Sequence, residues 1–593
     1  MSTEDRDLVD LMAKVEKGKI QLPDFQRGWV WDDNRIKALI LSVIRKYPVG
    51  AIMFLKYGAQ SIHFKYKPID GAPEQSKSEK PDELILDGQQ RLTSLYNALY
   101  SPEPVSTKTD KGKPISRYYY IDISEAMKPD CDDEKLIRSI PENKIVTRNF
   151  GKEIVLDLST REKEFEKKMF PLNLILKLNE ERQWENKYKK FYNYNPDIIE
   201  QLDTFYEKYI SPATKYKIPV ISLSEDTPKE AVCQVFENVN TGGVSLTVFE
   251  LVTAIFAMDG KHLREDWKTM EEEYFSDPVL SIVTATDFLT SMTLLTTYLL
   301  GHRPSCKKKD VLNLKMEDFY EYAEPLCKGF NEAKRILNEE KIYYKRDLPY
   351  STQLIPLAAI CTVLLDGDLI KQSTVKEKLK QWYWCGVMGE LYGAANETRY
   401  ANDIEQVVNW IKNNGELPKT INDAYFNPMR LTTLQTRQAA AYKGIMALVL
   451  KNNARDFISG EEMDFTLYQN ENIDIHHIFP KKHCIDMGYA KSLWNSVINK
   501  TPITGRSNKV ISGKAPSIYL KKLEDGGAVT PENLDAYLES HLINHELLRA
   551  DDFHGFIVDR AIKILNSIEK ATGKKIAGRD SAEVHDMFNA YLL

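Results

Sequence analysis

The pattern of apolar and polar residues divides the chain into regions of different character. Near the N-terminus, short apolar runs typical of strands alternate with stretches of helical period. After Asp32 or Asp33, either of which can cap a helix, apolar residues from Ile36 to Ile44 recur on one helical face. Short apolar runs predict strands at residues 51–57, 83–87, 118–123 and 217–223.

The pattern becomes helical further along. Thr247 and Glu250 have the spacing of a capping box, which predicts a helix that starts there. Residues 260–455 read as an all-helical section, and we assign its aromatic cluster at residues 382–384 to the core. The most apolar helical stretch, residues 354–365, is shorter than the ~20 residues that cross a bilayer. We therefore expect no membrane partner.

Size and composition favour a multidomain α+β protein. A chain of 593 residues is too long to fold around a single hydrophobic core. We therefore expect three domains, at residues 1–255, 256–455 and 456–593. The seven cysteines form no CxxC pair, which argues against a disulfide framework and favours the cytoplasm. The formal net charge of −6 means that any attraction to nucleic acid must be local.

Such a local field lies between His476 and Lys522. This segment holds nine basic residues and one acidic residue, Asp486, for a net charge of +8. From charge alone, a solvated lysine-rich surface is an equal alternative. If the segment binds DNA, the expected contacts are Lys481, Lys482, Arg506, Lys509 and Lys514.

A histidine pair within this segment is the strongest chemical signal. His476 and His477 follow β-branched residues that predict a strand, on which adjacent side chains point to opposite faces. Asn499 and Asn508 follow, nine residues apart, with a turn expected at Gly505. This order predicts a ββα-metal (HNH) nuclease fold. Phosphodiester attack needs a base that is neutral near pH 7 and a cation for the phosphate charge. We assign His477 as general base, His476 and Asn508 as metal ligands, and Asn499 as a catalytic-loop brace.

Two other metal arrangements compete with this assignment. His476, His477, His483 and Cys484 could form a structural zinc cage, although they lack the usual paired knuckles. His541 and His545 have helical spacing but no adjacent glutamate, so we interpret them as one face of a helix.

A second motif lies at a predicted strand–helix junction. Asp87-Gly88-Gln89-Gln90-Arg91 follows an apolar strand and leads into an apolar helix. Helix N-termini offer free N–H groups to anions, and an arginine adds a fork suited to phosphate oxygens. A capped turn without a ligand explains the residues equally well.

The motifs together resemble GmrSD-type and SspE-type modification-dependent restriction endonucleases. The resemblance rests on residues 22–31, 87–91 and 236–243 at one end, and on His476-His477-Ile478-Phe479-Pro480, Asn499 and Asn508 at the other. It implies a ParB/sulfiredoxin-like N-terminal domain that binds and hydrolyses nucleoside triphosphates, GTP or another, and a C-terminal nuclease. Implied nucleotide contacts are Gln26, Arg27, Asp87, Gly88, Gln89, Gln90 and Arg91, with amide donors from the turn at residues 240–243.

The chain departs from the family at His476, where many members carry an acidic residue. It also carries the N-terminal and the nuclease motifs on one chain, whereas in the family the two activities can lie on separate chains. In the helix that resembles the end of the nuclease domain, Arg560 is expected in a surface ion pair, with phosphate contact as the alternative.

These features predict an anti-phage, type IV-like restriction enzyme that cuts or nicks modified or foreign DNA. Its cofactors would be a divalent metal, Mg²⁺ first, and a nucleoside triphosphate that regulates cutting. Its partner would be double-stranded DNA, modified or from phage; a homo-oligomer is left open. The alternative is a DNA-modification-sensing regulator with a vestigial nuclease.

Overall fold

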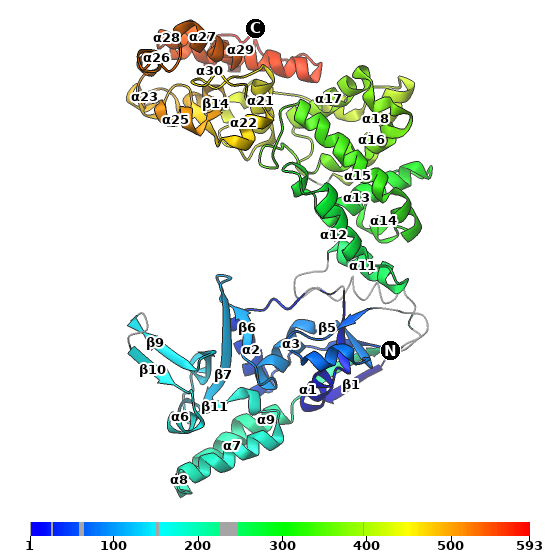
Figure 1. The fold of residues 1–593 in the computed structure, drawn as a ribbon, viewed down its shortest axis with the longest axis vertical. Coiled ribbons are helices and arrows are strands. Elements are labelled where there is room, and N and C mark those ends of the chain that lie inside the picture. The colour runs from blue at the N-terminus through cyan, green and yellow to red at the C-terminus, as the bar shows by residue number, and fades with distance from the viewer. Residues whose placement is uncertain are drawn as a thin grey trace. The chain divides into compact units, whose positions relative to one another are not determined.

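The computed structural model describes residues 2–593 apart from 25, 27, 58–64, 150–152, 225–226, 228–246, 395 and 512. The chain forms two compact units, residues 1–264 and 265–593, and mixes helices with several small sheets (Figure 1). The three-domain division stays a prediction. No helix within the described residues combines the length and apolarity that a membrane span requires.

The first unit is built on a six-stranded mixed sheet (Figure 1). β2 runs parallel to β5 and β12 parallel to β3, while the other neighbours are antiparallel. β1 pairs with β12 so that Ser2 lies opposite Ser222, and the sheet therefore joins the first and the last of its strands in the sequence. Its order is β1 (Ser2–Asp7), β12 (Lys217–Leu223), β3 (Ile52–Lys56), β5 (Glu83–Asp87), β2 (Ile20–Pro23) and β4 (Tyr66–Lys67).

Helices α1 (Leu8–Glu16), α2 (Asp33–Ile44) and α3 (Gln89–Leu99) bury their apolar faces in the core of this unit. The four strands predicted at residues 51–57, 83–87, 118–123 and 217–223 are confirmed as β3, β5, part of β7 and β12. Asp32 caps α2 by accepting a hydrogen bond from the Arg35 backbone. α3 begins at Gln89, earlier than the apolar pattern indicated, because Gly88 turns the chain directly into the helix.

A second sheet and several helices complete the first unit. β9 (Ile145–Arg148) and β10 (Glu153–Asp157) form a separate two-stranded sheet. The second sheet contains β6 (Val105–Lys108), β7 (Pro114–Asp122), β8 (Ile137–Pro141) and β11 (Met169–Pro171). The larger helices are α7 (Leu178–Phe191), α8 (Pro196–Phe205) and α11 (Val248–Met258), and α11 opens on the predicted Thr247–Glu250 capping box.

The second unit begins as a helical assembly, as predicted. α16 (Leu354–Leu365) is buried along nearly its whole length against α13 (Ala285–Leu299), α15 (Met316–Glu339) and α18 (Glu397–Asn413). Trp382, Tyr383 and Trp384 on α17 (Ser373–Met388) are all buried, which confirms their assignment to the core. α17 also packs against α29 (Phe553–Thr572), and α21 (Ala440–Lys451) packs against both of these helices.

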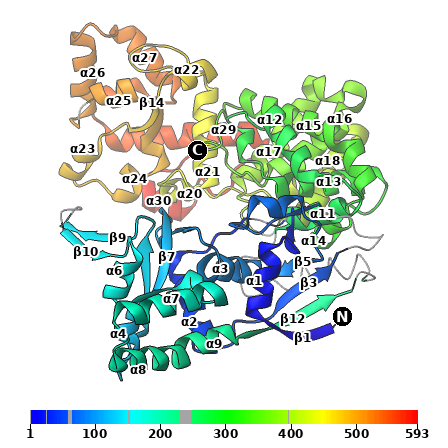
Figure 2. The ribbon, with the colours of Figure 1, turned by 60° about the horizontal axis from the view of Figure 1, so that its bottom comes forward.

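The candidate nuclease region lies in the same unit. β13 (Ile473–His477) pairs antiparallel with β14 (Lys500–Thr504), and α25 (Gly505–Val510) follows β14 and packs on both strands (Figure 2). Gly505 is the first residue of α25, so no separate turn occurs there. The long β13–β14 connection contains α23 (Lys481–Asp486) and α24 (Lys491–Trp494), and α26 (Pro516–Asp525), α27 (Pro531–Ser540), α28 (His545–Arg549) and α30 (Ala582–Phe588) come after α25.

Candidate functional site

The two histidines of β13 face opposite sides of its two-stranded sheet. Successive side chains of a strand alternate between faces, and cross-strand partners share a face. His476 pairs with Thr501, and His477 pairs with Lys500. The histidine pair therefore presents one imidazole to each side, as the sequence predicted.

On one face, His476 meets the helix that follows the sheet. Its Nδ1 lies 3.0 Å from Oδ1 of Asn508 on α25, and Nδ2 of Asn508 donates to Oδ2 of Asp474 at 3.2 Å. His476 is buried, and burial lowers its pKa to about 4. It is therefore neutral at pH 7, which is the form that can donate a lone pair to a metal.

On the other face, His477 contacts residues from the β13–β14 connection. Its Nε2 lies 3.2 Å from Oδ1 of Asn495, whose Nδ2 donates to Oε1 of Gln435 at 3.3 Å. The side-chain NH₂ of Asn495 donates to Gln435, so the amide oxygen of Asn495 faces the imidazole. An acceptor at this position favours the His477 tautomer that carries its proton on Nε2. The lone pair of His477 is then on Nδ1, where it can accept a proton.

The surroundings of His477 keep it neutral. Burial lowers its pKa below the usual 6.5, the Asn495 hydrogen bond raises it, and the charges of Lys500 and Lys481 lower it further. Lys500 is itself buried and donates to the Gln435 carbonyl at 2.7 Å, and burial lowers its pKa to about 8. A neutral base at physiological pH follows from this arrangement.

Asn499 holds the connection that carries these residues. Its buried side chain donates to the carbonyls of Phe479 and Trp494 at 2.9 and 2.8 Å, and its Oδ1 accepts the Phe479 N–H at 2.8 Å. Three hydrogen bonds from one amide fix both ends of the connection, because Phe479 follows β13 and Asn499 precedes β14. The Asn499 side chain therefore hydrogen-bonds to the backbone of the β13–β14 connection.

The basic residues of this region divide by exposure. Lys500 is buried, whereas the side chains predicted to contact DNA are all exposed: Lys481, Lys482, Arg506, Lys509 and Lys514. The zinc-cage alternative finds no support, since no group of three or more histidine, cysteine or acidic side chains in the described part of the chain is arranged to hold a metal.

Two expectations for the C-terminal helices are wrong. Arg560 is completely buried and donates to the carbonyls of Ile498, Lys500 and His541, so it can neither form a surface ion pair nor reach phosphate. His541 and His545 do not share a helix face: His541 caps the end of α27, and His545 begins α28. His541 is buried between the Thr501 hydroxyl and the Arg455 carbonyl, at 2.7 and 2.8 Å.

In the first unit, the second motif forms the predicted strand–helix turn. Gly88 has a φ of 87°, a left-handed conformation that glycine adopts without strain, and it connects β5 to α3. Arg91 donates through Nη2 to the Ala51 carbonyl at 2.7 Å and to Oδ2 of Asp87 at 3.1 Å. A Cβ on Gly50 would lie 2.6 Å from Nη1 of Arg91, so Gly50 makes room for this guanidinium. Arg91 ties its own turn, yet a quarter of its side chain remains exposed.

The glutamines of the motif lie around this turn. Gln26 is buried and donates to the Ile85 carbonyl of β5 at 2.6 Å. Gln90 accepts the Val30 N–H at 2.9 Å and so connects α3 to the loop before α2. Gln89, the first residue of α3, is also buried. Arg27 and the turn at residues 240–243 lie outside the described residues.

Comparison with known proteins extends these observations. Residues 8–257 match the family model of the N-terminal domain of the GmrSD restriction endonuclease. This stretch, less than half of the chain, is therefore similar to that N-terminal domain. An uncharacterized protein of Methanocaldococcus jannaschii is 28% identical over 578 residues, which cover 92% of this chain and 93% of that relative. The GmrSD-type region contains the Gly88 turn and ends within α11, so the HNH assignment, which lies outside it, stays a prediction.

Three residues beside the histidines were not among those predicted from the sequence. Asp474 shares the face of His476, and its position two residues earlier on a strand was the available signal. Asn495, from the connection, contacts His477, and Gln435, from the segment before α21, contacts Asn495. No local pattern marks Gln435, because only tertiary packing brings it across 60 residues to Asn495.

Proposed function

We propose that this GmrSD-type protein is a divalent-metal-dependent DNA endonuclease of antiviral defence, regulated by a nucleoside triphosphate in its N-terminal domain. The observation that carries the proposal is that the two histidines of β13 contact different residues on opposite faces of the strand. His476 meets Asn508 and Asp474 on one face, and His477 meets Asn495 on the other. A metal-ligand pair and a neutral base, separated by one peptide unit and surrounded by exposed lysines, suit phosphodiester hydrolysis.

The His476–Asn508 pair fits adjacent ligands of one cation. Nδ1 of His476 and Oδ1 of Asn508 lie 3.0 Å apart, and an imidazole nitrogen and an amide oxygen are both ligand types that a divalent cation accepts. His476 and Asn508 would hold such a cation, with Nδ1 of His476 deprotonated. Asp474, one hydrogen bond from Asn508, supplies a carboxylate for the same ion or for its waters. The ion would neutralise charge on the phosphate and on the leaving 3′ oxygen.

The chain's own residues would perform the proton transfer. Nδ1 of His477 would take a proton from the attacking water as the oxygen bonds to phosphorus; the bond from phosphorus to the 3′ oxygen breaks, and that oxygen takes a proton from solvent water. Asn495 holds the imidazole by its Nε2–H throughout, and Gln435 holds Asn495. Asn499 keeps both ends of the connection in place, so it acts as a positioning residue.

Support for the nucleotide function is the GmrSD-type match together with the turn at Gly88. Arg91 lies partly exposed in the first turn of α3, close to the positive end of the helix dipole. Nε of Arg91 is buried and has no hydrogen-bond partner in the described part of the chain, so a phosphate oxygen could satisfy it after a modest shift.

Plasmid cleavage tests the proposal. The purified chain should convert supercoiled plasmid to nicked or linear DNA only when Mg²⁺ or Mn²⁺ is added. Each nucleoside triphosphate should change the rate of cleavage. Phage DNA carrying different base modifications is tested beside the plasmid. The regulator alternative predicts DNA and nucleotide binding with no cleavage under any metal. Cleavage that persists in EDTA would reject the metal-dependent mechanism.

A further inference from the structure

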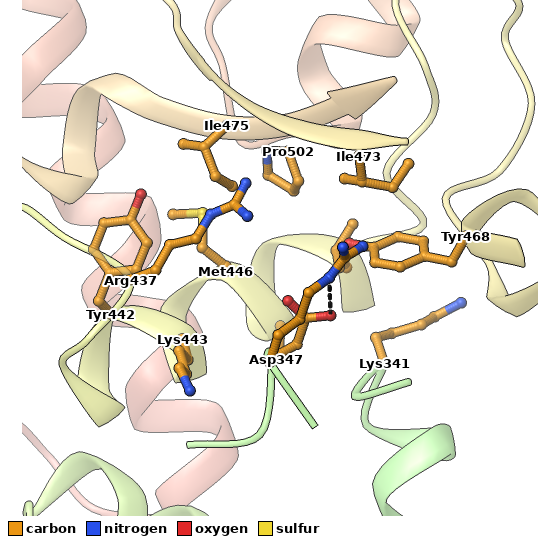
Figure 3. Close-up of a pocket in the computed structure, with 13 residues that line it drawn as sticks. Lys341, Asp347, Arg437, Tyr442, Lys443, Met446, Tyr468, Ile473, Ile475 and Pro502 are labelled. Carbon is orange, nitrogen blue, oxygen red and sulfur yellow. Dashed lines mark ion pairs between the residues drawn. The ribbon is translucent and has the colours of Figure 1, made fainter. Parts of the chain in front are cut away.

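A pocket opens on the face of the β13–β14 sheet that carries His477. Ile473, Ile475 and Pro502 form its strand wall, and α21, Tyr468 and the segments at residues 341–347 and 437 form the rest (Figure 3). By strand alternation, Ile475 and His477 point to the same side. Two strand residues span about 7 Å, so the pocket begins next to the proposed catalytic base.

The polar lining of this pocket is mostly basic. Asp347 is its one carboxylate among four cationic side chains, Lys341, Arg346, Arg437 and Lys443. Lys341 is paired with Glu462 at 2.9 Å, and Arg346 approaches Asp347 at 3.8 Å. The exposed guanidinium of Arg437 has neither a hydrogen bond nor an ion pair in the described part of the chain. The pocket therefore carries a surplus of positive charge.

Burial shifts the pKa values of Lys443 and Asp347 in this pocket. Burial lowers the pKa of Lys443, whose Nζ donates to the Leu348 carbonyl at 2.9 Å. Burial also raises the pKa of Asp347, although Arg346, Arg437 and Lys443 act in the opposite direction. Partly desolvated cations that lack enough anionic partners favour an incoming anion.

Gln435 links this pocket to the proposed catalytic base. Its side chain receives the Asn495 amide that contacts His477, and its backbone carbonyl receives Nζ of Lys500. Arg437 lies two residues further along the same segment. Tyr442 lines the pocket and also lies under the Lys500 ammonium, 5.9 Å from its ring centroid. One short segment thus fixes Asn495 and presents Arg437.

We propose that the pocket of Arg346, Arg437 and Lys443 binds a backbone phosphate of DNA that flanks the phosphate cut beside His477. The proposal deepens the proposed nuclease function and rests on it. A flanking phosphate held by a guanidinium would set the register of the strand without reading its sequence.

DNA binding measured without cleavage tests this inference. Fluorescence anisotropy of a labelled duplex of about 20 base pairs, with Ca²⁺ in place of Mg²⁺, gives affinity as a function of salt for the full chain. Arg437→Ala should weaken binding about tenfold or more at low salt and reduce the slope of log affinity against log salt by about one. Asp347→Asn removes the opposing charge and should tighten binding, an effect of opposite sign that general damage to the fold would not produce.

A charge-matched control and a competing ligand make the outcomes distinct. Lys371→Ala removes one exposed cation that pairs with Asp368, and its binding should match that of the parent. Unchanged affinity and salt slope in Arg437→Ala, with a parent that binds and cuts DNA, would overturn the flanking-phosphate site and leave the nuclease intact. Loss of nucleoside triphosphate affinity in Arg437→Ala, with DNA affinity unchanged, would also overturn it. A parent that binds no DNA would reject the proposed function as well.

Discussion

Oδ1 of Asn495 lies 3.2 Å from Nε2 of His477, and this contact assigns the imidazole proton to the nitrogen that faces away from the reaction. His477→Ala removes the base, so cleavage should fall by about 100-fold or more while DNA and nucleotide binding persist. Plasmid conversion with parallel anisotropy measures both. Full cleavage by a folded His477→Ala protein would refute the assignment.

The dependence of cleavage on pH should report the same base. His477 must be neutral to accept a proton, and its pKa lies below 6.5 because burial and nearby lysines oppose the charged form. The cleavage rate should therefore rise with pH through a midpoint below 6.5 and be flat by about pH 7. Asn495→Ala removes a hydrogen bond that raises this pKa, so the midpoint should move to still lower pH while the maximal rate falls. An unchanged midpoint would assign Asn495 a packing role only.

Metal binding should depend on the two residues that the β13–β14–α25 unit brings together. His476→Ala and Asn508→Ala should each weaken Mn²⁺ binding, measured by titration calorimetry, and raise the metal concentration needed for half-maximal cleavage. Asp474→Asn, which keeps the side-chain shape, tests whether the neighbouring carboxylate contributes. His545→Ala is the matched control, because His545 lies on α28 and contacts Glu539. One tightly bound zinc ion that survives in both site variants would contradict the assignment.

Arg91 has an observed structural role and a proposed phosphate-binding role, and one experiment can separate them. The structure shows it tied to Ala51 and Asp87, which predicts a loss of about 1 kcal/mol in the free energy of unfolding of Arg91→Ala. If it also clamps phosphate, nucleotide affinity should fall by about 1.5–3 kcal/mol. Titration with GTP, ATP, CTP and UTP beside a thermal melt distinguishes the two. A variant that melts earlier but binds every nucleotide normally would leave only the structural role.

Arg560 should be essential for folding of the C-terminal region. Arg560→Met would leave the carbonyls of Ile498, Lys500 and His541 buried without a donor, and we expect a loss of about 3 kcal/mol or more in the free energy of unfolding. Chemical denaturation measures this loss. Lys575→Met is the control, because the Lys575 side chain is almost fully exposed and its replacement should change stability little. Equal stability of the two variants would show that the buried guanidinium is dispensable.

Local patterns predicted the elements that carry the motifs, and tertiary packing decided their partners. Alternation along β13 and the glycine before α3 act over a few residues, so the sequence reveals them. Gln435 and Arg437 come from a loop with no periodic signal, and nothing local indicates that Gln435 contacts Asn495 or that Arg437 lines the pocket. Arg560 was wrongly expected at the surface because most arginines on helices are exposed, whereas here three main-chain carbonyls accept its hydrogen bonds in the interior.

The hydrogen bond from Arg560 to Lys500 of β14 also bears on the order in which the parts of the chain fold during synthesis. The strand that holds Asn508 and its helix in place is secured only when α29 has emerged from the ribosome, whereas the first unit ends at residue 264. At about 5–20 residues per second, the ribosome needs roughly 15–60 seconds to add the intervening residues. On the proposed function, the first unit therefore has time to fold before the proposed nuclease site is complete, so a regulatory domain would be present before cutting begins.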